Sequence, residues 1–365
     1  MEVSFKRMEL EDWFDRYQFE FDYDIGESGI KFFSTNDLGL DFSNIELRYG
    51  HHKGAPELRE LIASDFPGLK MSQVAVTNGA SESIFAVMAS LLGRQDHVVV
   101  EAPNYPSLYE IPSSLERDVS LYFLRYEEGF RLNLERLREE IKPNTKLVCL
   151  THPNNPTGSV ITESELNEVI QFVESRNLYL LMDETYRDLA FDTPPPLAAT
   201  ISPQAISVSS MSKAFGVPGI RIGWVAGPES LIDSVRAVRE QITICNSSVS
   251  EKIAFAILEQ KQAFLEKARE TVYANYKIMD KWIRERNDIE WISPAGGVVG
   301  FPRLVEDKSS EDLCTLLIER YRTFAVPGYC FKMPRYFRLG FGGDREEIEK
   351  GLEMLDKALV DLSAR

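Results

Sequence analysis

One lysine in the chain has neighbours that suit a nucleophile better than a surface charge. Lys213 ends the run Ser-Met-Ser-Lys, and small or apolar residues follow it. A lysine amine attacks a carbonyl group when its pKa is lowered, either by removal from water or by nearby cations. Arg221 comes eight residues later, and a guanidinium binds a phosphate through two parallel hydrogen bonds. Because Ser210 and Ser212 add hydroxyl donors, this segment predicts an amine nucleophile beside a phosphate site.

Two other loops could present polar groups to the same ligand. Ala80 and Ser81 begin an expected helix, where backbone N–H groups and the helix dipole attract a phosphate. Residues 152–158 read His-Pro-Asn-Asn-Pro-Thr-Gly, and the prolines and glycine fix a backbone that presents Asn155. Taken alone, each loop is explained equally well by a plain turn.

A carboxylate completes the set of groups. Asp183 follows an expected strand in Asp-Glu-Thr-Tyr, where it either caps a helix or faces a protonated ring nitrogen. Pyridoxal 5′-phosphate (PLP) is the one ligand that needs all of these groups, because its aldehyde, ring nitrogen, ring hydroxyl and phosphate each require a partner. The residues therefore predict a PLP site.

An α/β sheet is the element that must position these groups. Short apolar runs alternate with segments of helical periodicity, which predicts mainly parallel strands covered by helices on both faces. Ligands of such sheets bind at the carboxyl ends of the strands, where the groups described above stand. The expected strands are 74–77, 97–101, 119–124, 147–151, 178–182, 205–209 and 222–226. The expected helices are 56–65, 81–92, 133–141, 163–176 with a capping box at its start, one or two helices over 250–286, and 344–362.

The length of the chain predicts two domains. A chain of 365 residues exceeds the size at which single hydrophobic cores stop growing. We assign residues 46–250 to a large α/β domain. Residues 1–45 and 251–365 are assigned to a smaller, discontinuous α+β domain, joined to the first by a long helix near 250–286.

Composition excludes several classes of function. A formal net charge of −16 would repel a nucleic-acid backbone. The four cysteines show neither paired nor metal-ligand spacing, so we expect no metal site and interpret them as buried thiols of a reducing compartment. Neither a signal peptide nor an apolar run long enough to span a membrane is expected. These features predict a cytoplasmic protein.

At this point the sequence resembles the class I/II aminotransferases, which are PLP-dependent enzymes of fold type I. The resemblance extends from about Tyr49 to Arg338. It is carried by Asn-Asn-Pro-Thr-Gly at 154–158, Asp-Glu-x-Tyr at 183–186, Ser-x-Ser-Lys at 210–213 and Arg-x-Gly at 221–223. It implies a seven-stranded, mainly parallel sheet with a smaller second domain. It also implies a homodimer that acts on an L-amino acid and a 2-oxo acid.

The resemblance implies a role for each residue. Lys213 would carry PLP as a Schiff base and move a proton, Asp183 would hold the ring nitrogen, and Tyr186 would contact the ring hydroxyl. The residues implied to bind the cofactor are Ala80, Ser81, Tyr105, Asn155, Asp183, Tyr186, Ser210, Ser212, Lys213 and Arg221, with Tyr49 reaching the phosphate of the neighbouring subunit. Gly26, Asn155 and Arg338 would bind the substrate, and Arg338 would hold its α-carboxylate.

Departures from the family pattern leave the reaction open. The loop Ile-Gly-Glu-Ser-Gly-Ile at 25–30 lacks a usual proline, and Val298 and Val299 replace two aromatic residues, which predicts a more open pocket wall. The first hypothesis is an aminotransferase. The second is an enzyme of the same fold that eliminates, cyclises, decarboxylates or oxidises an amino acid. The third is a non-catalytic binding protein, against which the intact Lys213, Asp183 and Asn155 argue.

Overall fold

A seven-stranded sheet forms the centre of the computed structural model, which describes residues 5–39 and 45–364. The strand order is β2-β8-β7-β6-β5-β3-β4. Strand β8 runs antiparallel to β2 and β7, and the other pairs are parallel. The strands are β2 Val74–Thr77, β3 His97–Ala102, β4 Asp118–Phe123, β5 Thr145–Thr151, β6 Tyr179–Asp183, β7 Ala205–Ser210 and β8 Gly223–Ala226.

All seven strands predicted from the sequence are present, within two residues at each end. The prediction that every strand is apolar on both faces is wrong for β4. That strand lies at the edge of the sheet, and its terminal residues Asp118 and Phe123 are exposed. An edge strand has one neighbour instead of two, so water reaches part of its side chains.

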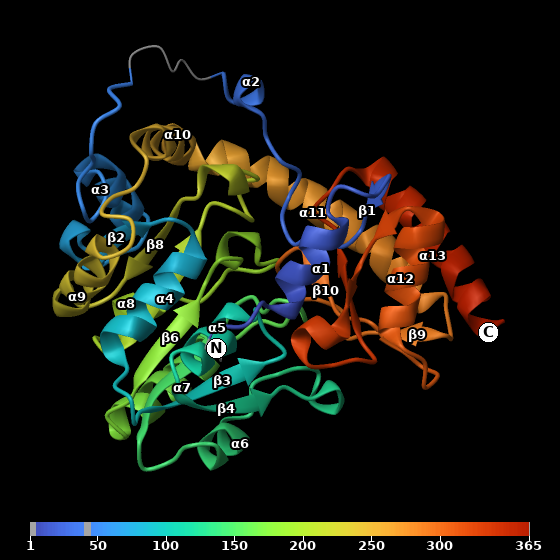
Figure 1. Cartoon of the computed structure of the whole chain (residues 1–365), viewed down its shortest axis with the longest axis horizontal. Helices are drawn as coiled ribbons and strands as arrows, with labels where there is room; N and C mark the ends of the chain where they lie inside the picture. The colour runs from blue at the N-terminus through green and yellow to red at the C-terminus, as the bar shows by residue number, and fades with distance from the viewer. Residues whose placement is uncertain (1–4, 40–44, 365) are drawn as a thin grey trace.

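Helices cover both faces of the sheet, as the sequence predicted (Figure 1). Alternate residues of each inner strand enter two separate cores, since successive side chains of a strand point to opposite faces. One core packs against α4 Ala80–Leu91, α5 Ser107–Ser114 and α9 Glu229–Glu240. The other packs against α3 Pro56–Ser64, α7 Glu163–Ser175 and α10 Ser248–Glu259.

Capping residues predicted from the sequence are found at the start of α7. At the start of α7 the Thr162 hydroxyl accepts a hydrogen bond from the Glu165 N–H, while the Glu165 carboxylate accepts one from the Thr162 N–H. This is the predicted capping box. The long helical stretch after residue 247 is two helices, because Gln260 ends α10 and α11 Lys261–Arg284 begins directly after it.

Residues 23–24, near one end of the chain, lie beside the C-terminal helix 345–363 at the right of Figure 1. Strand β1 Tyr23–Asp24 pairs in parallel with β12 Thr323–Phe324, and α1 Glu9–Tyr17 packs close by. The remaining elements of this part are α12 Ser310–Tyr321, α13 Arg345–Ser363, β9 Ile289–Glu290, β10 Val299–Gly300, β11 Arg303–Leu304, β13 Val326–Pro327 and β14 Phe337–Gly340. Three short α-helices remain in the described part of the chain, namely α2 Thr35–Leu38, α6 Leu134–Glu139, which corresponds to the predicted helix 133–141, and α8 Ala198–Ile201.

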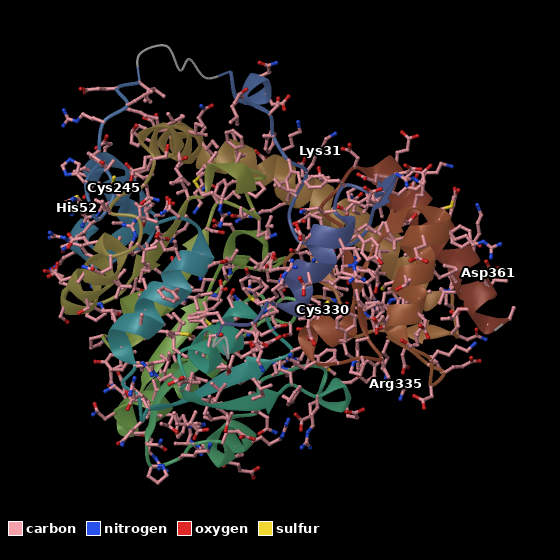
Figure 2. All side chains as sticks on the ribbon, viewed as in Figure 1. Lys31, His52, Cys245, Cys330, Arg335 and Asp361 are labelled. Carbon is pink, nitrogen blue, oxygen red and sulfur yellow. The ribbon has the colours of Figure 1, made fainter. Side chains whose placement is uncertain are left out.

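The four cysteines are free thiols. Cys149, Cys314 and Cys330 are buried and Cys245 is half-buried, and Cys245 and Cys330 lie well apart in Figure 2. Across residues 5–39 and 45–364, no helix combines the length and apolar character that crossing a bilayer requires. Over the same residues, no cluster of three or more metal-ligating side chains is present.

Candidate active site

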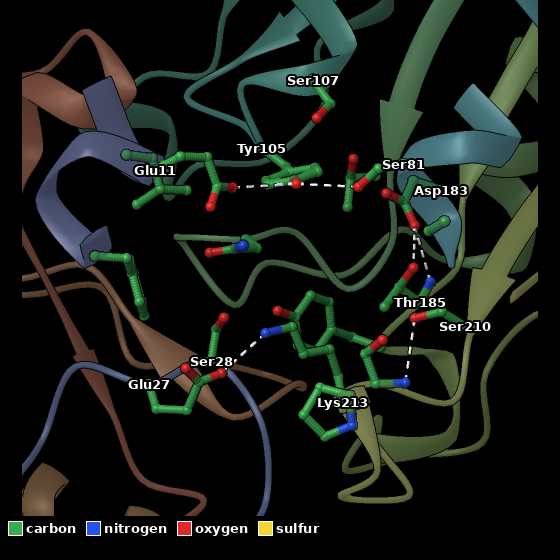
Figure 3. A pocket seen from close by; sticks show the side chains of 18 of the residues that line it. Glu11, Glu27, Ser28, Ser81, Tyr105, Ser107, Asp183, Thr185, Ser210 and Lys213 are labelled. Carbon is green, nitrogen blue, oxygen red and sulfur yellow. Dashed lines mark hydrogen bonds and ion pairs between the residues drawn. The ribbon is translucent and has the colours of Figure 1, made fainter. Parts of the chain in front are cut away.

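A cavity of about 650 Å³ opens at the carboxyl ends of β5, β6 and β7. All the residues predicted from the sequence line it except Gly26 and Tyr49. The predicted residues that line it are Ala80, Ser81, Tyr105, Asn155, Asp183, Tyr186, Ser210, Ser212, Lys213, Arg221 and Arg338. The opposite wall comes from the N-terminal segment 8–32 (Figure 3).

Lys213 projects into the cavity and meets a carboxylate that the sequence did not predict. Its Nζ lies 2.9 Å from Glu27 Oε1, and 26 % of the lysine side chain is exposed. Burial lowers the pKa of Lys213, but the charge of Glu27 and the hydrogen bond to it raise the pKa further than burial lowers it. The expectation of a lowered lysine pKa is therefore wrong, because Glu27 stabilises the ammonium form.

Asp183 is buried at the end of β6 without a cationic partner. Its Oδ1 accepts hydrogen bonds from the Thr185 backbone N–H at 3.0 Å and from the Thr185 hydroxyl at 2.6 Å. Burial raises the pKa of this carboxyl group, and the two hydrogen bonds oppose that change. No ion pair among the described residues includes Asp183. A buried carboxylate of this kind fits a protonated ring nitrogen, which would supply the missing positive charge.

Tyr186 supplies a second group without a partner. Its side chain is buried, and its Oη has no hydrogen-bond partner among the described residues. The Ser28 hydroxyl faces it without meeting hydrogen-bond geometry. Burial raises the pKa of this phenol, against the lowering effect of Lys213 and Arg338. An unsatisfied buried hydroxyl costs free energy, so its position fits contact with a ligand hydroxyl.

The residues predicted to bind a phosphate form a narrow cradle at the start of α4. A Cβ on Gly223 would lie 2.6 Å from the carbonyl carbon of Gly79 and 2.8 Å from the Ala80 nitrogen. Gly79 has φ +82°, and a Cβ there would collide with the Arg221 guanidinium. These glycines let the backbone N–H groups at the helix N-terminus and a guanidinium converge on one point.

Arg221 carries a charge that the protein itself leaves unpaired. Its Nη1 donates to the Pro218 carbonyl at 3.1 Å and its Nη2 to the Asn78 carbonyl at 3.4 Å. Within the described part of the chain it forms no ion pair with a carboxylate. An arginine held by neutral acceptors above a helix N-terminus fits the phosphate of PLP.

Arg338 is buried at the other side of the cavity. Its Nε and Nη2 donate to the Gly26 carbonyl at 3.1 and 2.8 Å, and its Nη1 donates to Asn155 Oδ1 at 3.3 Å. All of these acceptors are neutral, so the charge of the guanidinium stays available for an anion. Gly26 does not itself line the cavity. It holds Arg338 from behind through its carbonyl oxygen.

Tyr105 lies between the sheet and the N-terminal segment (Figure 3). Its hydroxyl is 3.1 Å from the Ser81 hydroxyl and donates to Glu11 Oε1 at 3.3 Å. The tyrosine lines the cavity as predicted, and its stacking on the ring of PLP stays a prediction. The bond to Glu11 links this wall to α1.

Besides Gly26, three residues singled out in the sequence lie outside the cavity. Tyr49 is 80 % exposed and lines a different pocket, so its contact with a neighbouring subunit stays a prediction. Val298 and Val299 are fully buried in the core and do not line the cavity. The prediction that these valines open the pocket wall stays a prediction.

Sequence reasoning missed several residues that line the cavity. Thr185 lies inside the Asp-Glu-Thr-Tyr motif, and Thr151 ends β5, so the position at a strand end was the available signal for both. Glu11 and Glu27 had no such signal, because they lie on a segment more than a hundred residues before the lysine loop. The glycine and the missing proline of the loop at 25–30 do not indicate that Glu27 faces Lys213.

Comparisons with known proteins agree with this geometry. The family model described as aminotransferase class I and II matches residues 40–355. A solved PLP-dependent aminotransferase from Streptococcus suis is 32 % identical, with a TM-score of 0.93 over 99 % of both chains. Capreomycidine synthase of Streptomyces vinaceus is 29 % identical over 96 % of this chain and 93 % of its own length. The solved PLP-dependent cyclase OrfR is 26 % identical, with a TM-score of 0.90 over 98 % of this chain and 97 % of its own.

Proposed function

The chain belongs to the class I and II aminotransferases, which are PLP-dependent enzymes of fold type I, and from this premise we propose how its residues transfer an amino group. The donor is an L-amino acid and the acceptor a 2-oxo acid. The observation that carries the proposal is the position of Lys213 in one cavity with Asp183, Asn155 and Arg338. The amine, carboxylate, amide and guanidinium groups that we assign to this reaction therefore all line one cavity.

PLP is the cofactor, and when bound it supplies an aldehyde that joins to amines and a ring that accepts electrons. The unpaired Asp183 carboxylate and the unsatisfied Tyr186 hydroxyl support a ring bound against β6. The glycine cradle beside Arg221 supports a phosphate at the start of α4. We propose that Ser81, Ser210 and Ser212 add hydroxyl and backbone donors to that phosphate.

The other side of the cavity binds the substrate. Arg338, held by the Gly26 carbonyl and Asn155, pairs with the α-carboxylate through its free charge. This ion pair fixes the amino acid so that its Cα hydrogen faces the Lys213 amine. The neutral Nζ of Lys213 would then take the Cα proton and later return it to a carbon of the bound cofactor.

A single-turnover experiment tests the reaction type. The PLP-loaded protein is mixed with an excess of amino acids and no 2-oxo acid, and the 2-oxo acid product is measured by mass spectrometry. Transamination forms one equivalent of product per subunit and then stops until an acceptor is added. Lys213→Ala should lower the rate at least about a thousandfold. Lys357→Ala, on the exposed face of α13, serves as the control and should react at the wild-type rate.

A second candidate is an enzyme of the same fold that does not transaminate. The similarity to capreomycidine synthase and to the cyclase OrfR, each over most of both chains, favours keeping it. Such an enzyme would consume its amino acid for many turnovers without any acceptor. The same single-turnover experiment would then show continuous loss of the amino acid and an altered product in place of a single equivalent of 2-oxo acid.

We further propose that residues 1–45 and 251–365 form the small domain and 46–250 the large one. The pairing of β1 with β12 supports the first assignment, because it joins the two chain ends. A homodimer with shared active sites is proposed from Tyr49, which lies outside the cavity of its own chain. The four free thiols support a reducing compartment such as the cytoplasm.

A further inference from the structure

The wall of the cavity that faces the sheet is acidic. It is formed by the N-terminal segment, which lines the cavity with Met8, Leu10, Glu11, Phe14, Gln18, Glu27, Ser28 and Phe32. Two of these side chains are carboxylates, and none is a lysine or an arginine. A substrate side chain that extends from the reacting carbon towards this wall therefore meets negative charge and aromatic surface.

The charged side chains on the other walls of the cavity already have roles in the proposed function. Arg221 serves the phosphate, Asp183 the ring nitrogen and Arg338 the α-carboxylate. Glu27 forms one ion pair within the described residues, and its partner is Lys213. Lys213 must be a neutral amine to take a proton from the substrate, and in that form it would no longer be a cationic partner for Glu27.

Glu27 is held in place by its own backbone. The Asp24 carboxylate accepts hydrogen bonds from the Gly26 and Glu27 N–H groups, both at 2.8 Å. Strand β14 passes directly behind, where a Cβ on Gly340 would collide with the Glu27 carbonyl oxygen. The Glu27 side chain is 23 % exposed, and it points into the cavity towards Lys213 (Figure 3). A fixed carboxylate binds a cation without the entropy cost of ordering a loop.

Burial of Glu27 would be costly without a new cation. Burial raises the pKa of its carboxyl group, while Lys213 and Arg338 lower the pKa further, so that the group is ionised in this structure. Without the charge of Lys213 its lowering effect on the pKa of Glu27 is lost, and a cation on the substrate would replace that effect. Two charges at close range attract each other more strongly in such a site than in water.

We propose that Glu27, assisted by Glu11, recognises a cationic side chain, so that the amino donor carries an ammonium or guanidinium group. This inference rests on the proposed function, since it takes the N-terminal wall to be the side-chain end of the substrate site. Phe14 and Phe32 line the same wall and cover the aliphatic part of the side chain. A side-chain carboxylate is repelled at this wall, so acidic donors are excluded.

Two matched pairs of donors test the recognition of charge with the PLP-loaded protein. L-Arginine is compared with L-citrulline, which has the same length but a neutral end, and L-lysine is compared with L-norleucine. We expect the cationic member of at least one pair to have a kcat/KM at least about tenfold higher, and L-glutamate to be poorer than all four. Equal or better use of the neutral or acidic donors would overturn the inference while leaving the aminotransferase assignment intact.

Variants of Glu27 separate recognition from an effect on Lys213. Glu27→Gln should lower kcat/KM for the cationic donors at least about tenfold and leave the neutral donors nearly unchanged. Glu27→Asp keeps the charge and should keep the preference. Glu20→Gln, an exposed residue of the same segment, is the control. Equal loss for all donors would mean that Glu27 acts only through Lys213, and the inference would fail.

A binding measurement keeps the two proposals distinguishable. If no donor yields a 2-oxo acid, the proposed function fails, yet the thermal shift that each amino acid produces in the PLP-loaded protein still reports binding. A larger shift with L-arginine than with L-citrulline, lost in Glu27→Gln, would support recognition of charge. Equal shifts with both amino acids would contradict it.

Discussion

Two side chains lack a partner at the place in the cavity where we propose that the cofactor binds. Asp183 is a buried carboxylate without a cation, and the Tyr186 hydroxyl is buried without a hydrogen-bond partner in the described residues. Folding normally avoids such groups, because each one costs about 1–3 kcal/mol when it is left unsatisfied. Their presence in one cavity indicates that the fold is adapted to a bound ligand.

Tyr186→Phe should therefore act in opposite directions without and with PLP. In the cofactor-free protein it removes an unsatisfied hydroxyl, so the free energy of unfolding should rise by about 1–2 kcal/mol. In the PLP-loaded protein it removes a contact, so the gain in Tm on adding PLP should shrink. Thermal unfolding of both forms measures this, with the exposed Tyr273→Phe as control. A variant with lower stability without PLP and an unchanged gain on adding it would contradict the assignment.

At the scale of elements, Glu101 links β3 through hydrogen bonds to the loops that contain residues of the candidate site. Its Oε2 accepts hydrogen bonds from the Thr151 N–H at 2.9 Å, from Asn154 Nδ2 at 3.1 Å and from Asn104 Nδ2 at 3.2 Å. Burial raises the pKa of the Glu101 carboxyl group to about 7, although the bonds from Thr151 and Asn154 oppose the change. Between these two pKa values, Glu101 is therefore more protonated in the folded protein than in the unfolded chain, whose carboxyl group has the ordinary pKa of 4.5.

This raised pKa predicts a pH dependence of stability. Between about pH 4.5 and pH 7 the folded state binds more protons than the unfolded state, so the contribution of Glu101 to stability falls as the pH rises. Glu101→Gln resembles the protonated form and avoids this loss. Its stability relative to the wild type should therefore increase by about 3 kcal/mol from pH 4.5 to pH 8. Urea unfolding at both pH values measures the difference, with the exposed Glu319→Gln as control, and a flat difference would contradict the prediction.

The junction of β8 with the start of α4 also predicts an effect at the scale of elements. The Cβ added by Gly223→Ala would meet backbone atoms of Gly79, Ala80 and Ser209, which cannot move aside as a flexible side chain can. We expect a loss of about 1–3 kcal/mol in stability and weaker binding of PLP. Gly219→Ala is a matched control, because its Cβ would meet nothing within 4 Å. Equal PLP affinity in the two variants would show that the cradle is not the phosphate site.

At the scale of the whole molecule, two neighbouring segments of the chain, around residues 47–52 and 239–244, carry exposed apolar side chains. Leu47 and Tyr49 are 81 % and 80 % exposed, and Ile242 and Ile244 are also exposed. The two segments lie side by side, since Arg239 Nη1 donates to the His52 carbonyl at 2.7 Å. Exposed apolar side chains gathered in one place are typical of a subunit interface.

We therefore expect analytical ultracentrifugation to give the mass of two chains. Tyr49→Phe should leave the dimer intact and weaken PLP binding about tenfold, because a hydroxyl that reaches the phosphate of the neighbouring subunit is lost. Equilibrium dialysis measures the affinity for PLP. A wild-type protein with the mass of one chain would contradict the shared site. A Tyr49→Phe variant with unchanged affinity for PLP would also contradict it.

The sequence by itself determined the sheet and the residues at its carboxyl edge. Strands, helices and their ends depend on patterns of a few neighbouring residues, such as the capping box at Thr162 and the apolar run before Asp183. Because parallel strands bring their carboxyl ends to one edge, the order of elements along the chain was enough to gather Asn155, Asp183 and Lys213. Two local details were wrong or left open, namely the edge position of β4 and the division into α10 and α11.

Only the tertiary structure decided what faces that edge. Glu27 lies 186 residues before Lys213, and the Gly26 carbonyl that holds Arg338 lies 312 residues before it. No local pattern links such distant residues, because their contact depends on the packing of the two chain ends against the sheet. That packing puts a carboxylate beside the lysine and raises the pKa of the amine, where the sequence had predicted a lowered one. The residues of the proposed cofactor site could thus be predicted from strand ends, whereas the carboxylates that face them follow from long-range packing.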